Sequence, residues 1–329
     1  MRIVWVLVIG VVAAAIAGCG GGGEETTSAP AEPRDLSITL NGNYGPENLG
    51  VLMAYELDYF EEAGVRVSIS SPVAPARPGI YVANRTVDFG VSHLPQVALA
   101  QEKGAPIVAI GSLIPEPTAA LIWLPKSGIK DIADLKGKTI AIPGLSFQRD
   151  LLETVLADAG LTLNDVKVEN VEYELVPALV KGEADAIFGG TWNVEGVELE
   201  TRGLNPVITR VQDLGIPDYE ELVVIARRDR LNEDPDSIRD FMAALTEGTT
   251  AAIEDPAAAT KALIAQGYED VGEKATEAQI EATLPLLSAG GEMDPDQADQ
   301  LAEWMRDEKM IENSLSASDL ITDDYLSGG

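Results

Sequence analysis

The segment from Gly189 to Gly196, which reads GGTWNVEG, combines several groups that suit the binding of a small flat molecule. Two adjacent glycines let the backbone approach a bound molecule closely. The Trp192 ring can stack on a flat ring, and the Asn193 amide offers both a donor and an acceptor. Glu195 can accept two hydrogen bonds from an amino-substituted heterocycle or balance a cation. The alternative is that Trp192 belongs to the core and that Glu195 caps its own helix.

Gly144 and Ser146 lie at the start of a predicted helix over residues 147–159. The free backbone N–H groups of a helix start can bind a polar or anionic group. The segment is neither a dinucleotide-binding GxGxxG motif nor a P-loop, because the required glycines and the GKS or GKT sequence are absent. The alternative is a glycine turn in which Ser146 caps the helix.

His93 is the only histidine of the chain, and it follows a predicted buried strand over residues 88–92. It could donate a hydrogen bond to a ligand, or it could be a core imidazole. A histidine metal site or a Ser-His-Asp triad would depend on this one residue. We therefore expect a binding protein without catalytic residues, metal or cofactor. Asn41 and Tyr44, after the first predicted strand, add an amide and an aromatic ring to the candidates.

Cys19 ends an N-terminal segment that has the layout of a secretory signal. Arg2 is followed by an apolar run over residues 3–17, which is shorter than the about 20 residues of a stable membrane span. The sequence IAGC at 16–19 resembles a bacterial lipobox, whose cysteine receives lipid and becomes the mature N-terminus. The alternatives are an ordinary cleaved signal or a short anchor helix.

Composition narrows the classes of partner. The formal net charge is −31, so the surface repels phosphate backbones, and nucleic-acid binding is not expected. Cys19 is the only cysteine, which excludes an internal disulfide. If Cys19 carries lipid, no thiol remains for catalysis or metal binding.

Strands and helices alternate from Asp35 onward, which implies an α/β fold with mostly parallel sheets. The predicted strands cover 36–40, 65–69, 88–92, 107–113, 120–124, 139–142, 166–171, 184–188, 205–209 and 221–226. The predicted helices cover 49–63, 96–103, 147–159, 175–181, 236–253, 256–266, 276–287 and 295–309. Two such series followed by a helical tail imply two lobes, with a ligand site between them at the carboxyl ends of strands.

Several segments resemble one family of solute-binding proteins. They read DFGVS at 88–92, GAPIVAIG at 104–111, DLKGK at 134–138, LVPAL at 175–179, DAIFGGTWNVEG at 185–196 and IPDYEEL at 216–222. In these segments the chain is similar to solute-binding proteins of ABC importers. More narrowly, it resembles the thiamine-pyrimidine-precursor binding proteins, whose family includes the yeast thiamine-pyrimidine synthase.

The resemblance implies a two-lobed periplasmic binding protein fold of the second type, with mixed sheets and a helical C-terminal part. The expected parts are a signal peptide at 1–18, a lipidated Cys19 with a linker at 19–34, a first lobe at 35–124 plus 225–329, and a second lobe at 125–224. The implied role is an extracytoplasmic receptor, lipid-anchored to the outer face of the cell membrane or periplasmic. It would be a monomer that delivers a pyrimidine-type thiamine precursor to an ABC permease and its ATPase.

Other cargoes and an enzymatic role stay open. Riboflavin-binding relatives use the same scaffold, so riboflavin, another small heterocycle or a sulfonate is an alternative ligand. The synthase chemistry of the family consumes a histidine and needs iron, a lysine-bound pyridoxal phosphate and a cysteine-rich stretch. A chain whose only cysteine is Cys19 does not match that pattern.

The resemblance also supplies further site residues. It carries over Trp192, Asn193 and Glu195, together with Gly144, Ser146 and Tyr219. The complete candidate set is Asn41, Tyr44, Asn48, His93, Gly144, Ser146, Trp192, Asn193, Glu195 and Tyr219.

The chain departs from the family after the first strand. Relatives carry Asp and Trp where this chain has Asn41 and Gly42, and Asn and His where it has Gly45 and Asn48. They also often carry Tyr at the position of His93. These changes alter the first-lobe half of the pocket, where Tyr44 is the expected aromatic partner.

Overall fold

A computed structural model describes residues 32–268 and 272–326 of the chain. The predicted signal peptide, Cys19 and most of the predicted linker lie outside the described residues. Among the described residues, no helix is both long enough and apolar enough to span a membrane.

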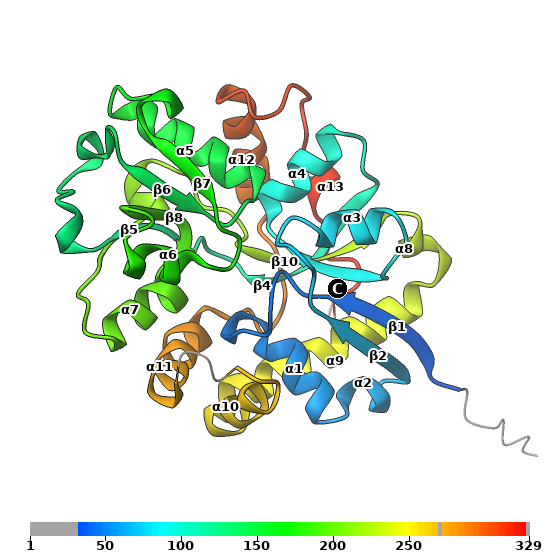
Figure 1. Ribbon diagram of the computed structural model, residues 1–329. Coiled ribbons are helices and arrows are strands. Elements are labelled where there is room, and N and C mark those ends of the chain that lie inside the picture. Colours follow the sequence, from blue (N-terminus) through cyan, green and yellow to red (C-terminus); the bar gives the residue numbers. More distant parts are fainter. Residues whose placement is uncertain (1–31, 269–271, 327–329) are drawn as a thin grey trace, which may run out of the picture. The chain divides into compact units, whose positions relative to one another are not determined.

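Five strands of the described chain form the first sheet, in the order β2–β1–β3–β10–β4 (Figure 1). They are β1 (Arg34–Thr39), β2 (Val65–Ser70), β3 (Phe89–Ser92), β4 (Ile107–Ile114) and β10 (Leu222–Arg227). β1 pairs in parallel with β2 and β3, whereas β10 is antiparallel to both β3 and β4.

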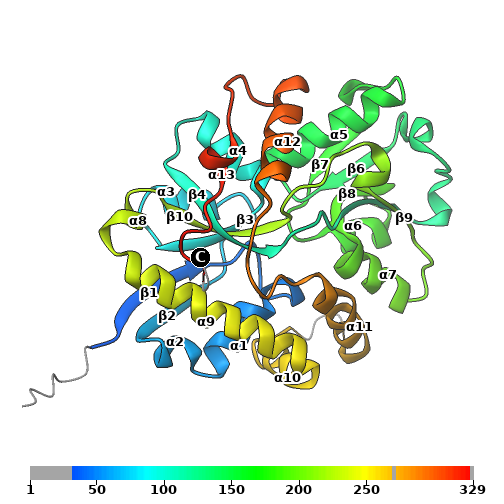
Figure 2. The same cartoon turned by 180° about the vertical axis from the view of Figure 1, so that it is seen from behind.

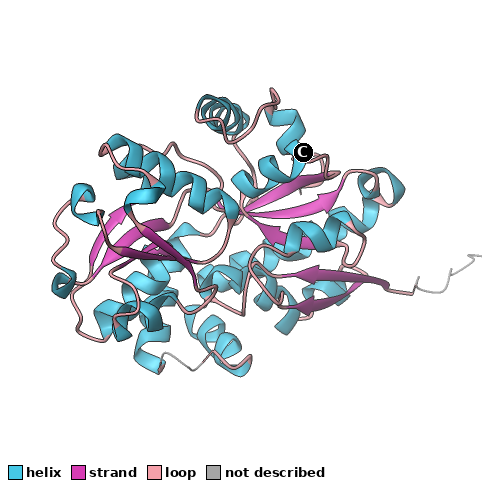
Figure 3. Cartoon of the chain, turned by 45° about the horizontal axis from the view of Figure 1, so that its top comes forward, coloured by secondary structure: helices cyan, strands magenta, loops and turns pink. Residues whose placement is uncertain are grey.

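The second sheet repeats this plan, in the order β7–β6–β8–β5–β9. Its described strands are β5 (Ala119–Trp123), β6 (Thr139–Ile142), β7 (Lys167–Asn170), β8 (Ala186–Thr191) and β9 (Val207–Arg210). Here β5 is the antiparallel strand, paired with β8 and β9. Figure 3 shows the strands in two separate groups, each with helices around it. The predicted two-lobed α/β fold with mixed sheets is confirmed.

Helices surround both sheets (Figures 1 and 2). In the described chain they are α1 (Leu49–Glu56), α2 (Tyr59–Glu62), α3 (Pro78–Ala83), α4 (Leu94–Glu102), α5 (Ser146–Asp158), α6 (Leu175–Lys181), α7 (Val197–Thr201), α8 (Arg230–Glu233), α9 (Pro235–Glu254), α10 (Pro256–Ala265), α11 (Glu273–Thr283), α12 (Pro295–Asp307) and α13 (Ala317–Leu320). Two short helical segments also matter for the site, the 3-10 turn η1 (Pro46–Asn48) and the π-helical η5 (Trp192–Gly196).

The chain crosses between the sheets at residues 115–118 and 211–221. The sequence analysis placed these crossings near Leu124 and Val224. Strand β5 therefore belongs to the second sheet, although its residues fall within the range expected for the first lobe. Strand β10 belongs wholly to the first sheet. The difference arises because an apolar strand pattern does not say which sheet supplies the pairing partners.

The predicted helix over residues 49–63 is broken into α1 and α2. The break is at Asp58, which precedes α2 with φ of 61° in the left-handed region. The last long helix, α12, begins as predicted, because the Asp294 side chain accepts hydrogen bonds from the N–H groups of Asp296 and Gln297.

Each face of the first sheet is covered by helices. Phe241 of α9 stacks on Phe89 of β3 and on Phe60 of α2, with ring centroids 4.3 and 5.2 Å apart. α3 and α4 pack against β3 and β4. Their buried side chains belong to a hydrophobic cluster other than the one that contains Phe241. Burial of these apolar rings is the main force that holds the helices on the sheet.

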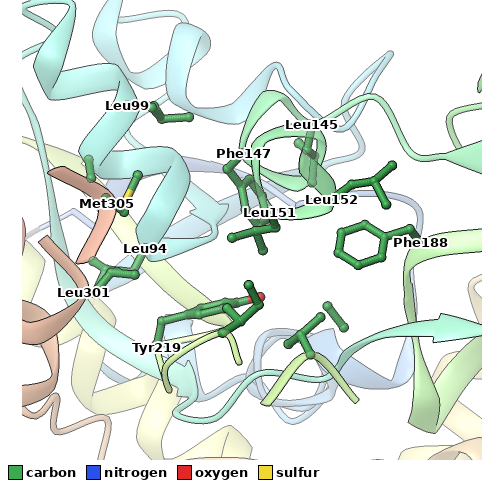
Figure 4. Packing of buried hydrophobic residues seen from close by; sticks show 14 of the residues in the cluster. Leu94, Leu99, Leu145, Phe147, Leu151, Leu152, Phe188, Tyr219, Leu301 and Met305 are labelled. Atoms are coloured by element: carbon green, nitrogen blue, oxygen red, sulfur yellow. The ribbon is translucent and has the colours of Figure 1, made fainter. Parts of the chain in front are cut away.

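One hydrophobic cluster includes residues of both lobes (Figure 4). It contains Leu94 of α4 from the first lobe and Phe147 and Leu151 of α5 from the second. Tyr219, in the second crossing segment, and Leu301 of α12 complete this part of it. The two lobes therefore share a packed core beside the crossing segments.

Candidate functional site

His93 and Glu221 form a buried pair at the junction of the lobes. His93 precedes α4, and Glu221 is the last residue before β10. The His93 Nδ1 atom lies 3.1 Å from Glu221 Oε1, and the two side chains are 12% and 2% exposed. The His93 ring also lies 5.2 Å from the Phe147 ring of the second lobe, between centroids. His93 thus contacts residues of both the crossing segment and the second lobe.

The same carboxylate binds the first crossing segment. Glu221 Oε2 accepts hydrogen bonds from the N–H groups of Thr118, at 2.7 Å, and Ala119, at 3.4 Å. The neighbouring Tyr219 is fully buried, and its pKa is raised by burial and by the negative charge of Glu221. Glu221 therefore connects the two crossing segments and His93 in one buried network.

Glu47 in η1 brings a second carboxylate to this region from the first lobe. Its pKa is raised to about 7, first by burial and then by the charge of Glu195. A hydrogen bond from its own backbone, a hydrogen bond with Asn41 and the charge of His93 act in the opposite direction. Asn41 Oδ1 also accepts a hydrogen bond from Asn48 Nδ2 at 3.0 Å. The predicted residues Asn41 and Asn48 thus lie together beside Glu47, which the sequence analysis missed.

Glu195 is the corresponding carboxylate of the second lobe. Its Oε2 atom accepts from the N–H of Thr191 at 2.7 Å and from Thr191 Oγ1 at 3.0 Å. Burial raises the pKa of Glu195, and the charge of Glu221 raises it further. One oxygen accepts from the residue that precedes η5, as the alternative for this residue expected, and the backbone N–H of Glu195 also bonds to its own carboxylate.

Asn193 is turned toward α11. Its Nδ2 atom donates to Thr283 Oγ1 at 2.8 Å, and the side chain is 1% exposed. Gln279, also on α11, donates to the Val194 carbonyl at 3.0 Å and accepts from the Tyr268 hydroxyl at 2.9 Å. α11 also contacts η1, so this helix joins the Glu47 and Glu195 sides of the site (Figure 2).

Trp192 is half-buried against the core of the second lobe. The Arg210 guanidinium lies over its ring, 4.1 Å from the ring centroid. One face of the indole is therefore occupied by a cation–π contact. A stacked ligand would have to use the other face or displace Arg210.

Gly144 and Ser146 lie on either side of Leu145, the N-cap of α5. Gly144 has φ of 83°, and a Cβ there would lie 2.5 Å from Asn170 Oδ1, so the position requires glycine. Ser146 is exposed and is the first residue of α5, whose N-cap is Leu145. The alternative in which Ser146 caps this helix is wrong. Gln148, one turn into α5, instead donates to the Gly189 carbonyl at 3.1 Å.

Tyr44 does not join the buried network. It lines a separate groove of about 780 Å³ together with Tyr55 and Glu56 of α1. Burial is the largest cause that raises the pKa of Tyr44, and the charges of Tyr55 and Glu56 raise it further. The aromatic side chain that reaches the first-lobe loop comes instead from the second lobe. Tyr173 follows β7, and its Cε1 atom lies 3.2 Å from where a Cβ of Gly42 would be.

Glu47, Glu221 and Tyr173 are the site residues that the sequence analysis missed. Glu47 adjoins Asn48 in the loop after the first strand, which was already a candidate segment. Glu221 opens the apolar strand sequence ELVVIA, where a carboxylate needs a partner when it is buried. Tyr173 gives no comparable signal, because its approach to Gly42 depends on how the lobes pack.

The network is rich in hydrogen-bond acceptors. Glu47, Glu195 and Glu221 bring carboxylates from the first lobe, the second lobe and the crossing segment. Such a set suits a ligand that presents N–H groups, as an amino-substituted ring does. Its position between the lobes suits enclosure of that ligand when the lobes close.

Comparison with known proteins identifies the family of the chain. The family model NMT1/THI5 like matches residues 45–259. A thiamine biosynthesis protein of Haemophilus influenzae is 30% identical over 282 residues, which are 85% of this chain and 89% of the relative. A formylaminopyrimidine-binding protein of Halalkalibacterium halodurans is 27% identical over 274 residues, which are 81% of this chain and 83% of the relative.

Other relatives carry enzyme names. A 4-amino-5-hydroxymethyl-2-methylpyrimidine phosphate synthase of Schizosaccharomyces pombe is 28% identical over 67% of this chain and 66% of the relative. Among solved structures, the alkanesulfonate-binding protein of Xanthomonas axonopodis pv. citri has a TM-score of 0.71 and 19% identity, over 89% of this chain and 99% of that chain. That likeness shows the periplasmic binding protein fold. By its sequence, the chain belongs to the NMT1/THI5-like family.

Proposed function

We propose that this protein is the substrate-binding component of an ABC importer and captures a pyrimidine-type thiamine precursor of the formylaminopyrimidine kind between its lobes. The observation that carries the proposal is the His93–Glu221 pair at the lobe junction, where the charge of Glu221 also acts on the Glu195 carboxylate. The Glu195 carboxylate can accept from the ring amino group. A relative named for formylaminopyrimidine binding, matched over most of both chains, supports the same class of ligand.

The direct test is binding to the purified domain that begins near Pro33. Thermal shift and calorimetry would compare thiamine, its formylamino- and aminomethyl-pyrimidine precursors, riboflavin and small sulfonates. A ligand at 100 times its dissociation constant adds about 2.7 kcal/mol to the free energy of unfolding. We expect a shift with pyrimidines alone. A shift only with riboflavin or a sulfonate would keep the receptor role and change the cargo.

Two variants test the site itself. Glu195→Gln and Trp192→Ala should each weaken pyrimidine binding by about tenfold or more, since 1.4 kcal/mol is a factor of ten. Glu200→Gln is the matched control, because Glu200 is an exposed carboxylate of the neighbouring helix α7. Unchanged affinity in both site variants would contradict the proposed site.

Membrane anchoring through Cys19 is part of the same proposal. The IAGC sequence at 16–19 supports it. Mass spectrometry of the membrane-bound parent should find Cys19 as the N-terminal residue with lipid attached, and the Cys19→Ser variant should carry no lipid. An unmodified Cys19 in the parent would exclude lipid on Cys19 as the anchor.

The second candidate function is a pyrimidine synthase, as several relatives are named. In that case His93 would be consumed as a reactant. Its buried contact with Glu221 instead supports a positioning role for the imidazole. After prolonged incubation with the iron and pyridoxal phosphate that the synthase chemistry needs, mass spectrometry should find His93 intact and the ligand unchanged. Loss of the His93 side chain would favour the synthase.

A further inference from the structure

Helix α11 is attached to the first lobe by apolar side chains. Ile280 of α11 and Leu284, which follows the helix, are buried in one hydrophobic cluster. The same cluster contains Leu49 and Met53 of α1 and Leu263 of α10. Because burial of apolar surface is what holds these helices together, α11 belongs mechanically to the first lobe.

The contacts of α11 with the second lobe are polar. Thr283 Oγ1 accepts a hydrogen bond from Asn193 Nδ2 at 2.8 Å. Gln279 Nε2 donates to the Val194 carbonyl at 3.0 Å, and both α11 side chains are fully buried. The Tyr268 hydroxyl donates to Gln279 Oε1 at 2.9 Å. That bond orients the Gln279 amide so that its N–H group faces η5.

These bonds cross the boundary between two hydrophobic clusters. α7 contacts α11, yet Leu199 of α7 and Trp192 of η5 belong to a cluster of the second lobe that does not include Ile280. Interfaces between parts of a chain that move relative to one another are more polar than permanent ones. Hydroxyl and amide groups can bond to water after separation, whereas apolar side chains cannot. The contact between α11 and η5 is therefore where the lobes can part.

The segment that α11 holds carries predicted ligand residues. η5 includes Trp192, Asn193 and Glu195, and α11 also contacts η1, which includes the predicted residue Asn48. Figures 1 and 2 both show α11 beside α7 and α10. One helix thus touches the predicted site segments of both lobes.

We propose that α11 is a clasp that closes the ligand site, with Gln279 and Thr283 as positioning residues that hold η5 against the first lobe. When the lobes open, the two hydrogen bonds break and α11 stays on the first lobe. The clasp therefore limits how fast a bound ligand leaves. This inference goes beyond the proposed function, on which only the choice of ligand in its test rests.

The distance between the lobes tests the clasp directly. The compact unit that begins at Pro33 contains no cysteine, so spin labels can be attached at Glu200→Cys in α7 and Glu254→Cys in α9. Both positions are exposed. Double electron–electron resonance would compare the label distances with and without a formylaminopyrimidine. Thr283→Val removes the acceptor of Asn193 Nδ2 and keeps the side-chain shape, so we expect more of this variant at the longer distances.

A matched control lies on the same helix. Thr276 is also a fully buried threonine of α11, but its hydroxyl donates to the Gly272 carbonyl at the start of that helix. Thr276→Val should therefore keep the label distances of the parent. Thr283→Ser keeps the hydroxyl and should restore them. Gln279→Met removes the bond to the Val194 carbonyl and should act like Thr283→Val, so the test does not depend on one variant.

Ligand dissociation gives the second readout. In stopped-flow experiments, Thr283→Val and Gln279→Met should each raise the dissociation rate constant of the formylaminopyrimidine about tenfold. The association rate constant should change much less, as is usual for changes within one interface. Thr276→Val should leave both rate constants unchanged. A merely structural role of Thr283 would lower the free energy of unfolding and move neither the label distances nor the dissociation rate.

The outcomes separate the clasp from the proposed function. Equal label distances in the parent, Thr283→Val and Gln279→Met, with and without ligand, would overturn the clasp. An equal shift in Thr276→Val would overturn it too, because it would show a general loosening of α11. Shifted distances with an unchanged dissociation rate would overturn its role in ligand release. If the pyrimidine does not bind but the distances shift as expected, the clasp stands and the proposed function fails.

Discussion

His93 and Glu221 are 128 residues apart in the chain, yet His93 Nδ1 lies 3.1 Å from Glu221 Oε1. The other oxygen of Glu221 accepts the Thr118 N–H at 2.7 Å. One carboxylate thus holds together the imidazole, the first crossing segment and the second crossing segment. Because these segments are where the chain passes between the lobes, this pair fixes the geometry of the junction.

Glu221→Gln should lower the free energy of unfolding by about 1–3 kcal/mol, because it removes one of the two buried acceptors. Urea denaturation measures this change. The control is Glu116→Gln, an exposed change of the same charge in the crossing segment 115–118, which should stay within about 0.5 kcal/mol of the parent. Equal effects of the two changes would contradict the bridging role.

The preceding residue, Glu220, makes stability depend on pH. Burial raises its pKa to about 7, the charges of Asp323 and Asp294 act in the same direction, and hydrogen bonds from Ser112 and the Asp294 N–H oppose them. The folded protein therefore holds this proton more tightly than the unfolded chain. Its contribution to stability is complete below the unfolded value near 4.5 and is lost as pH rises through about 7.

Glu220→Gln should therefore lose less stability than the parent between about pH 5 and about pH 8. Unfolding free energies of the two proteins at both pH values test this. Glu116→Gln should follow the pH dependence of the parent. A Glu220→Gln variant that also follows the parent would show that Glu220 is ionised over the whole range.

Thr283→Val should weaken the attachment of α11 to the second lobe. The variant keeps the shape of the side chain but leaves the buried Asn193 Nδ2 without its acceptor, so we expect a loss of about 1–3 kcal/mol. Thr260→Val is the matched control, since its hydroxyl bonds only to the Pro256 carbonyl of its own helix. If Asn193→Ala and Thr283→Val add independently in a double-mutant cycle, the two side chains do not interact.

Gly248→Ala should destabilise the contact between α1 and α9. A Cβ at Gly248 would lie 2.4 Å from the Gly50 carbonyl oxygen and 2.5 Å from the Ala54 nitrogen, and backbone atoms cannot move aside easily. Overpacking of this kind costs about 1–3 kcal/mol. Gly79→Ala in α3 meets only an ordinary contact at 3.5 Å, so it should be neutral or stabilising. Thermal unfolding of the two variants measures the contrast.

The sequence by itself determined the order of the elements and much of their extent. Alternating apolar residues predicted most strands, and local signals such as Asp294 before Pro295 located helix ends, because these features depend on neighbours in the chain. The GGTWNVEG segment was predicted to follow a strand and to open a helix. Its GGT residues instead belong to the end of β8, and its WNVEG residues form η5. Family resemblance then supplied the two-lobed fold.

Only the tertiary structure decided which side chains meet at the lobe junction. Glu47 and Glu221 are recognised as site residues only from their burial and their interactions with residues distant in the chain. Pairing with β8 and β9 places β5 in the second sheet. Tyr44, the expected aromatic partner, lines a separate groove, whereas Tyr173, for which there was no expectation, approaches Gly42, because the direction of a loop side chain depends on the packing around it. Contacts between residues far apart in the chain carry no local pattern, and such contacts build this site.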